Sequence, residues 1–94
     1  MKSIIQSEKV CYRTGATFDL EEHHVYGGNP NRKLSEKYGL KIWLKADYHR
    51  NTKHSIHMNK EFREQVQRDV QLIAMKHYGW TVDDFRQIFG RSFI

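Results

Sequence analysis

Histidines are the residues of this 94-residue chain best suited to chemistry, and five of the six fall into two groups. His23 and His24 are adjacent, follow two glutamates and precede Gly27-Gly28. The second group lies farther along the chain: His49, His54 and His57. A neutral imidazole binds divalent metals, and it can take up a proton near neutral pH. If folding brings the two histidine groups together, we expect a metal site beside a further histidine that is free to act as a base.

Each histidine group also has a plainer interpretation. Neighbouring side chains on a regular strand point to opposite faces, so His23 and His24 serve one site only if the strand ends or bulges near Gly27-Gly28. Otherwise they are two surface histidines, or one is buried and hydrogen-bonded. In the second group, a helix places two residues five apart poorly for one metal and two residues three apart acceptably, which favours His54 with His57. It also stays open that these three histidines lie by chance in a solvated polar loop and bind nothing.

Length, charge and cysteine count limit the classes of protein to which this chain can belong. The length predicts one domain over residues 1–94, with residues 1–9 as a loosely held end. A net charge of +5 favours a polyanionic partner such as nucleic acid. A single cysteine, Cys11, excludes an internal disulfide and a four-cysteine zinc site, and it favours a reducing, cytoplasmic setting. No segment approaches the ~18 apolar residues of a membrane span, so we expect a soluble protein without membrane contact.

The pattern of apolar residues predicts an α+β fold that must position the histidines. Short strands are expected over 10–12, 20–26 and 40–44. A helical turn is expected over 34–38, and Asp47 is expected to cap another that carries His49. The long helix runs from its cap Asn59 to Gly79, with four apolar residues facing inward: Phe62, Val66, Val70 and Ile73. Thr81 and Asp84 form a capping box for a last helix that ends at Gly90.

Four runs of the sequence, taken in order, resemble small phage-type members of the HNH endonuclease superfamily. These runs are EEHHVYGG, NPNRKLSEKYGLKIWL, ADYH and SIHMNKEF, and the resemblance covers roughly residues 9–94. It implies the ββα-metal fold, in which a β-hairpin and a helix grip one divalent ion, here with added C-terminal helices. It also implies a metal-dependent endonuclease that hydrolyses DNA.

The resemblance assigns roles to single residues. It places metal ligands at His23 and His49, a further ligand at His57, and the general base at His24. Asn31 matches the middle asparagine of the motif, although Gly39 stands where many members carry asparagine. Imidazole ligands favour a transition metal such as Zn²⁺, Mn²⁺ or Ni²⁺, whereas the relatives commonly use Mg²⁺. Cys11 stands alone, so no structural zinc is expected.

Basic residues cluster between the two histidine groups and are suited to contact the phosphates of DNA. Half or more of them can equally be solvated surface. They are Arg32, Lys33, Lys37, Lys41, Lys45, Arg50 and Lys53.

The resemblance implies a phage-encoded or prophage-encoded enzyme in the bacterial cytoplasm, acting alone, as a homodimer or with a recombination or replication protein. One alternative is a catalytically silent nucleic-acid-binding or regulatory module on the same fold. Another is a purely structural metal domain, which would need four closed ligands.

Overall fold

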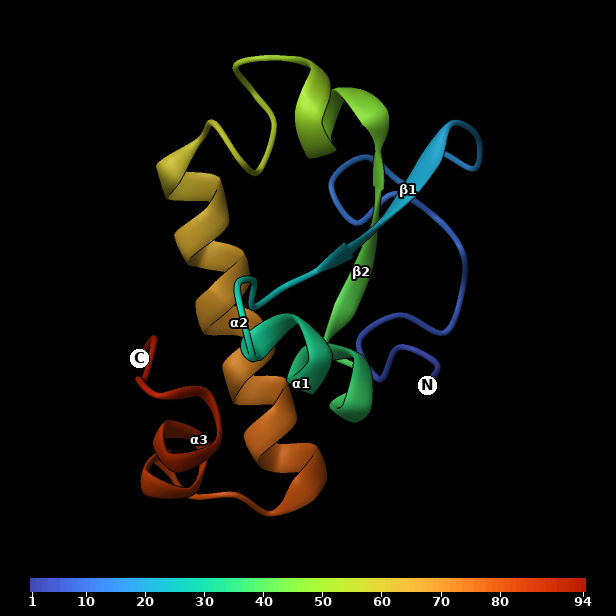
Figure 1. Cartoon of the computed structure of the whole chain (residues 1–94). Coiled ribbons are helices and arrows are strands. Elements are labelled where there is room, and N and C mark those ends of the chain that lie inside the picture. The colour runs from blue at the N-terminus through green and yellow to red at the C-terminus, as the bar shows by residue number, and fades with distance from the viewer.

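A computed structural model of the chain describes residues 1–50 and 52–94 in full, and residue 51 without its side chain. The elements follow one another as strand β1, helix α1, strand β2, the π-helix η1, and helices α2 and α3 (Figure 1). Their bounds are Leu20–His24, Asn31–Tyr38, Lys41–Lys45, Asp47–Asn51, Lys60–Tyr78 and Val82–Phe89. The fold is therefore α+β, as the sequence predicts.

The sheet consists of β1 and β2, which pair antiparallel with His23 opposite Ile42 and His24 opposite Lys41. The two strands are not joined by a tight turn, because α1 lies between them in the chain. The expected hairpin is therefore an antiparallel pair with a helical insertion. The strand expected over 10–12 is wrong: the amide of Cys11 bonds to Ala16 and its carbonyl accepts from Gly15, which makes a compact turn.

The core lies between the sheet and α2. Alternate residues of β2, Ile42 and Leu44, are buried, and they share one apolar cluster with Val66 and Val70 of α2. Figure 1 shows α2 running along one side of the molecule beside the strands. Burial of these side chains contributes roughly 1.5–3 kcal/mol each, which fixes the strands against the helix.

Tyr26 connects the sheet to the C-terminal helix. Its ring lies 5.3 Å from that of Phe85, 4.9 Å from that of Phe89 and 4.9 Å from that of Phe93. Its hydroxyl donates to the carbonyl of Gln67 at 2.6 Å, so the buried polar group has a partner. Burial raises the pKa of this hydroxyl, which stays protonated.

The ends of α2 and α3 follow the predicted capping residues, whereas Asp47 does not cap η1: the N-cap there is Ala46, without a side-chain bond. Asn59 accepts a hydrogen bond from the amide of Phe62, and Gly79 ends α2 in the left-handed conformation at φ 70°. Both bonds of the capping box between Thr81 and Asp84 are formed. One inward position was predicted wrongly, because Ile73 is exposed on α2.

Gln71 and Ala74 are the buried residues of α2 on the turn that carries Ile73. The amide of Gln71 donates to Ser92 at 2.9 Å and accepts from the amide of Phe93 at 2.6 Å. Burial of a glutamine whose amide groups are both hydrogen-bonded costs little free energy. The bonds from the C-terminal segment therefore allow a polar residue to be buried where the helical pattern predicts an apolar one.

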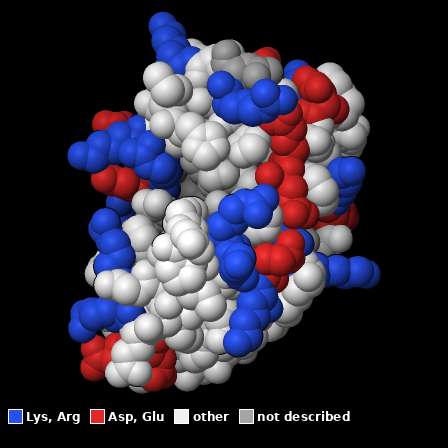
Figure 2. Space-filling view, in the orientation of Figure 1, with Lys and Arg blue, Asp and Glu red and all other residues white. Residues whose placement is uncertain are grey.

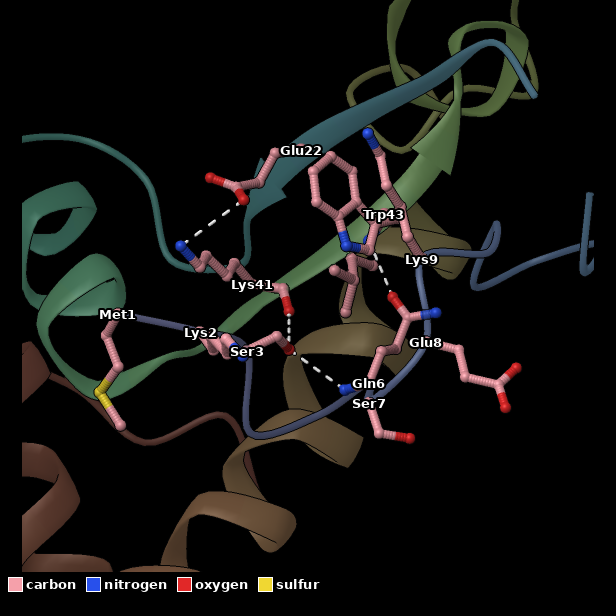
Figure 3. A pocket seen from close by; sticks show the side chains of 11 residues that line it. Met1, Lys2, Ser3, Gln6, Ser7, Glu8, Lys9, Glu22, Lys41 and Trp43 are labelled. Carbon is pink, nitrogen blue, oxygen red and sulfur yellow. Dashed lines mark hydrogen bonds and ion pairs between the residues drawn. The ribbon is translucent and has the colours of Figure 1, made fainter. Parts of the chain in front are cut away.

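The N-terminal segment is bound to β2. The hydroxyl of Ser3 donates to the carbonyl of Lys41 at 2.6 Å, and the amide of Trp43 donates to the side-chain oxygen of Gln6 at 2.8 Å (Figure 3). Ile4 and Ile5 pack against the apolar core. The expected loosely held end does not fit these contacts, since residues 3–6 cover the open edge of β2 and satisfy its backbone groups.

Among the residues that the structure describes, no helix combines the length and apolar character needed to cross a membrane.

Candidate metal centre

Three histidines from separate segments converge on one point. His23 lies on β1, His49 on η1, and His57 in the turn that precedes α2. The ring centroid of His23 lies 5.2 Å from those of both His49 and His57, and the last two are 5.0 Å apart. One nitrogen from each ring lies within 4.8 Å of the other two. We refer to these three residues as the histidine triad.

The histidine triad fits a divalent transition metal. Imidazole nitrogens bind Zn²⁺ at about 2.0–2.1 Å, so two such ligands of one ion are at most about 4.2 Å apart. Only small side-chain movements separate the present spacing from that limit. His54, which the sequence left open as a ligand, is exposed and lies outside the triad.

The local backbone explains why these residues meet. The amide of Ile56 donates to the carbonyl of Tyr48 at 2.7 Å, which ties the turn carrying His57 to η1. The Arg63 guanidinium of α2 donates to the carbonyl of His57 at 3.2 Å, which ties the same turn to α2. A π-helix is rare and frequently occurs at functional sites, and here it carries His49.

The surroundings favour the neutral form of two of the three triad histidines. Removal from water, with the neighbouring rings of His49, His57 and His24, lowers the pKa of His23 to about 3. Partial desolvation also lowers the pKa of His57, with contributions from His49 and Arg63. A neutral imidazole keeps the lone pair that metal binding requires, so protons compete less with an ion at His23 and His57.

Glu21 orients His49 and was not identified from the sequence. Nδ1 of His49 donates to Oε1 of Glu21 at 2.8 Å, which leaves Nε2 with the lone pair. Arg50 donates to both oxygens of the same carboxylate, to Oε1 at 2.9 Å and to Oε2 at 2.7 Å. Arg50 first, then His49, lower the pKa of Glu21 to about 2. The sequence held one signal for Glu21: side chains two residues apart on a strand share a face, so Glu21 lies on the same face as His23.

His24 lies beside the triad rather than in it. Its Nε2 lies 3.3 Å from Oε1 of Glu36, and its side chain is 12% exposed. Lys41 binds the same Glu36 carboxylate at 2.7 Å and Glu22 at 3.5 Å. A carboxylate accepts, so Nε2 carries the proton and Nδ1 the lone pair. His24, Glu22 and Glu36 also form a group whose ligand atoms lie within 4.8 Å of one another, with Lys41 as its cation.

A cleft of about 320 Å³ brings the triad and His24 to one solvent-accessible space. We call it the histidine cleft. Two guanidinium groups, from Arg32 and Arg63, also line it, and Arg63 was not among the predicted residues. The full lining is Glu22, His23, His24, Val25, Gly27, Arg32, His49, His57, Arg63 and Gln67.

The predicted DNA-contacting residues separate into four groups. Arg32 lines the histidine cleft, whereas Lys41 and Arg50 are held in ion pairs, and Lys41 is buried. The prediction of a phosphate contact does not fit the buried Lys41, whereas Arg50 is 64% exposed and its phosphate contact stays a prediction. Two further lysines lie over aromatic rings and two are exposed. They are Lys37 over Tyr38, Lys45 over Phe18, and the exposed Lys33 and Lys53.

Asn31 is placed elsewhere. Its side-chain amide donates to the carbonyl of Phe89 at 3.0 Å, which ties the first turn of α1 to the end of α3. It does not line the histidine cleft. The structure therefore gives Asn31 a connecting contact between helices in place of the expected contact with the catalytic base.

On the face shown in Figure 2, basic side chains lie over α1 and along α2, and a band of acidic side chains runs over the strands. No family model, curated protein or solved structure matched the chain.

Proposed function

We propose that this protein is a metal-dependent endonuclease of the HNH type that hydrolyses phosphodiester bonds of DNA. The observation that carries the proposal is the convergence of the histidine triad, with His24 and two arginines lining the same cleft. Neither histidine group alone would make this site, because its members come from segments that only folding brings together.

His23, His49 and His57 would hold one divalent ion. When bound, the ion acts as a Lewis acid that neutralises charge on the phosphate and the leaving oxygen. The triad itself is held by Glu21 on His49 and by burial of His23, so the ligands are oriented before binding. Three protein ligands are typical of catalytic sites, which keep a position open, and fewer than the four of a closed structural zinc site.

His24 is the general base of the proposed reaction. With its Nε2 proton directed to Glu36, the lone pair on Nδ1 can accept a proton from an attacking water. Glu36 fixes this ring orientation and stabilises the imidazolium that proton transfer creates. The carboxylate is itself held by Lys41 at 2.7 Å, so its position does not depend on His24 alone.

Arg32 and Arg63 are suited to bind the substrate phosphate. A guanidinium group presents a planar fork of donors that matches phosphate oxygens. Arg63 is anchored by the carbonyl of His57, which sets its distance from the triad. The side chains that line the cleft thus supply the base, the metal ligands and the anion binding that hydrolysis needs.

The test is nicking of supercoiled plasmid in Mg²⁺, Mn²⁺, Ni²⁺ or Zn²⁺ by the wild type and by His24→Ala. We expect wild-type nicking in at least one metal, and a loss of about 10²–10⁴-fold in the variant. His77→Ala is the matched control, since His77 is an exposed residue of α2 outside the cleft. Metal affinity measured by calorimetry should be retained in His24→Ala.

The alternative functions give different results in the same assay. DNA binding without nicking in any of the four metals would favour the catalytically silent binding module. Metal binding without either activity would favour a structural role.

A further inference from the structure

A second hollow adjoins the histidine cleft on the outer face of α2. Its volume is about 350 Å³, and it shares Arg63 and Gln67 with the cleft. Its other lining residues come from α2 and the C-terminal segment. They are Glu64, Arg68, Arg91 and Phe93. We call this hollow the arginine groove.

Cationic groups dominate the arginine groove. Arg63, Arg68 and Arg91 contribute three guanidinium groups against the one carboxylate of Glu64. Glu64 also lies 3.9 Å from the ammonium group of Lys60, which offsets part of its charge. Arg68 and Arg91 are exposed, so their donors are accessible to a ligand.

Arg91 is held in place rather than free in solvent. Its guanidinium lies over the ring of Phe93, 4.5 Å from the centroid. The amide of Phe93 donates to the buried Gln71 at 2.6 Å, and the amide of Gln71 donates to Ser92 at 2.9 Å. The C-terminal segment therefore holds the ring on which the Arg91 guanidinium rests at the groove, which favours ligand binding.

We propose that the arginine groove binds the sugar-phosphate backbone of the DNA strand next to the phosphate held in the histidine cleft. The shared residues Arg63 and Gln67 make the two hollows neighbours, so one strand can pass from one to the other. This inference names the substrate path of the proposed nuclease and rests on that function for its direction.

Arg63 and Arg68 are both residues of α2 and both line the groove, whereas Arg91 reaches it from the C-terminal segment. The groove therefore presents guanidinium groups from two segments to one ligand.

The groove lining also indicates what is recognised. Phe93 is the single aromatic residue of the lining, and Arg91 already covers its ring. Base stacking is therefore not favoured here, and guanidinium contacts to phosphate carry no sequence information. We expect the groove to increase affinity for any sequence equally.

The experiment measures binding of a fluorescent 20-base-pair DNA duplex in EDTA at several salt concentrations, by anisotropy. The Arg68→Ala/Arg91→Ala variant should bind more weakly, and its slope of log K against log salt should be shallower by about two. Two unrelated sequences should lose affinity by the same factor. The matched control is Lys76→Ala/Arg86→Ala, which removes two cations elsewhere on α2 and α3.

The proposal would be refuted if the double variant had the same salt slope as the wild type. It would also be refuted if the control variant lost as much DNA affinity as the double variant. Absence of DNA binding by the wild type would refute it as well. Arg68→Ala alone should remove about half of the slope change, which guards against a folding defect in the double variant. Loss of binding in the variant, with no nicking by the wild type in any metal, would refute the nuclease and leave the groove standing.

Discussion

Glu21 and His49 are 28 positions apart in the chain, and their side chains meet through a hydrogen bond of 2.8 Å from Nδ1 to Oε1. The bond selects the tautomer of His49 in which Nδ1 carries the proton and Nε2 the lone pair. Because Arg50 holds the same carboxylate, the orientation of one metal ligand depends on a charged pair that does not itself bind metal.

Glu21→Gln should weaken metal binding by about 10–100-fold, the usual effect of losing a partner that orients a ligand. The amide can still accept a hydrogen bond but no longer carries the charge that attracts Arg50. Calorimetric titration with Zn²⁺ measures the effect. Glu61→Gln, an exposed change on α2, should leave the affinity unaltered; equal affinities for all three proteins would contradict the role of Glu21.

Metal should stabilise the folded protein through the triad. At a metal concentration 100 times Kd, the free energy of unfolding rises by about 2.7 kcal/mol, which corresponds to roughly 10–20 °C in Tm for a chain of this size. Thermal unfolding monitored by circular dichroism, with and without EDTA, measures the shift. His57→Ala should abolish it, whereas the exposed neighbour His54→Ala should retain it. A shift lost in both variants, or in neither, would argue against the triad.

Glu36→Gln should slow DNA cleavage without changing metal affinity. The carboxylate orients His24 and stabilises its protonated form, so its loss is expected to cost less than the removal of His24 itself. Single-turnover nicking rates at saturating metal give the comparison. A rate equal to that of the wild type would mean that the bond of 3.3 Å has no part in the reaction.

Acid should destabilise the protein partly through Glu36. The Lys41 ammonium, the amino group of Met1 and His24 lower the pKa of this carboxyl from 4.5 to about 2. A lowered pKa in the folded state contributes stability above pH 4.5 that is lost as the pH falls toward 2. The carboxylate is 43% exposed, so solvent screening keeps the effect small.

Urea unfolding in EDTA at pH 6 and pH 3 measures this loss. The Glu36→Gln variant should lose less stability between the two pH values than the wild type, since its side chain does not titrate. Identical losses would show that the ion pair with Lys41 contributes nothing measurable.

Asn31→Ala should lower stability by about 0.5–1.5 kcal/mol, the usual contribution of one hydrogen bond. The lost bond joins α1 to the carbonyl of Phe89, and metal affinity should be unchanged. Urea unfolding together with calorimetric titration with Zn²⁺ separates the two properties. If Asn31→Ala binds metal more weakly but is as stable as the wild type, Asn31 contributes to the metal site after all.

The sequence by itself determined the ends of α2 and α3, but not the start of α1 at Asn31 or the cap of η1. Asn59, Gly79 and the Thr81–Asp84 box act within one turn of the backbone they satisfy, so their effect is local and readable from spacing. It also identified His23, His49 and His57 as candidates, through residue type and the stated resemblance. Ile73 was wrongly expected to face inward. Gln71 is buried on that turn instead, because it bonds to the distant Ser92 and Phe93.

The tertiary structure alone decided which of these residues meet. His57 joins the triad and His54 does not, because the bond from Ile56 to Tyr48 ties the turn carrying His57 to η1. Folding likewise withdrew Lys41 and Arg50 into ion pairs and brought Arg63 into the cleft. Side-chain partners far apart in the chain carry no periodic signal, so their pairing is set by packing and charge in three dimensions.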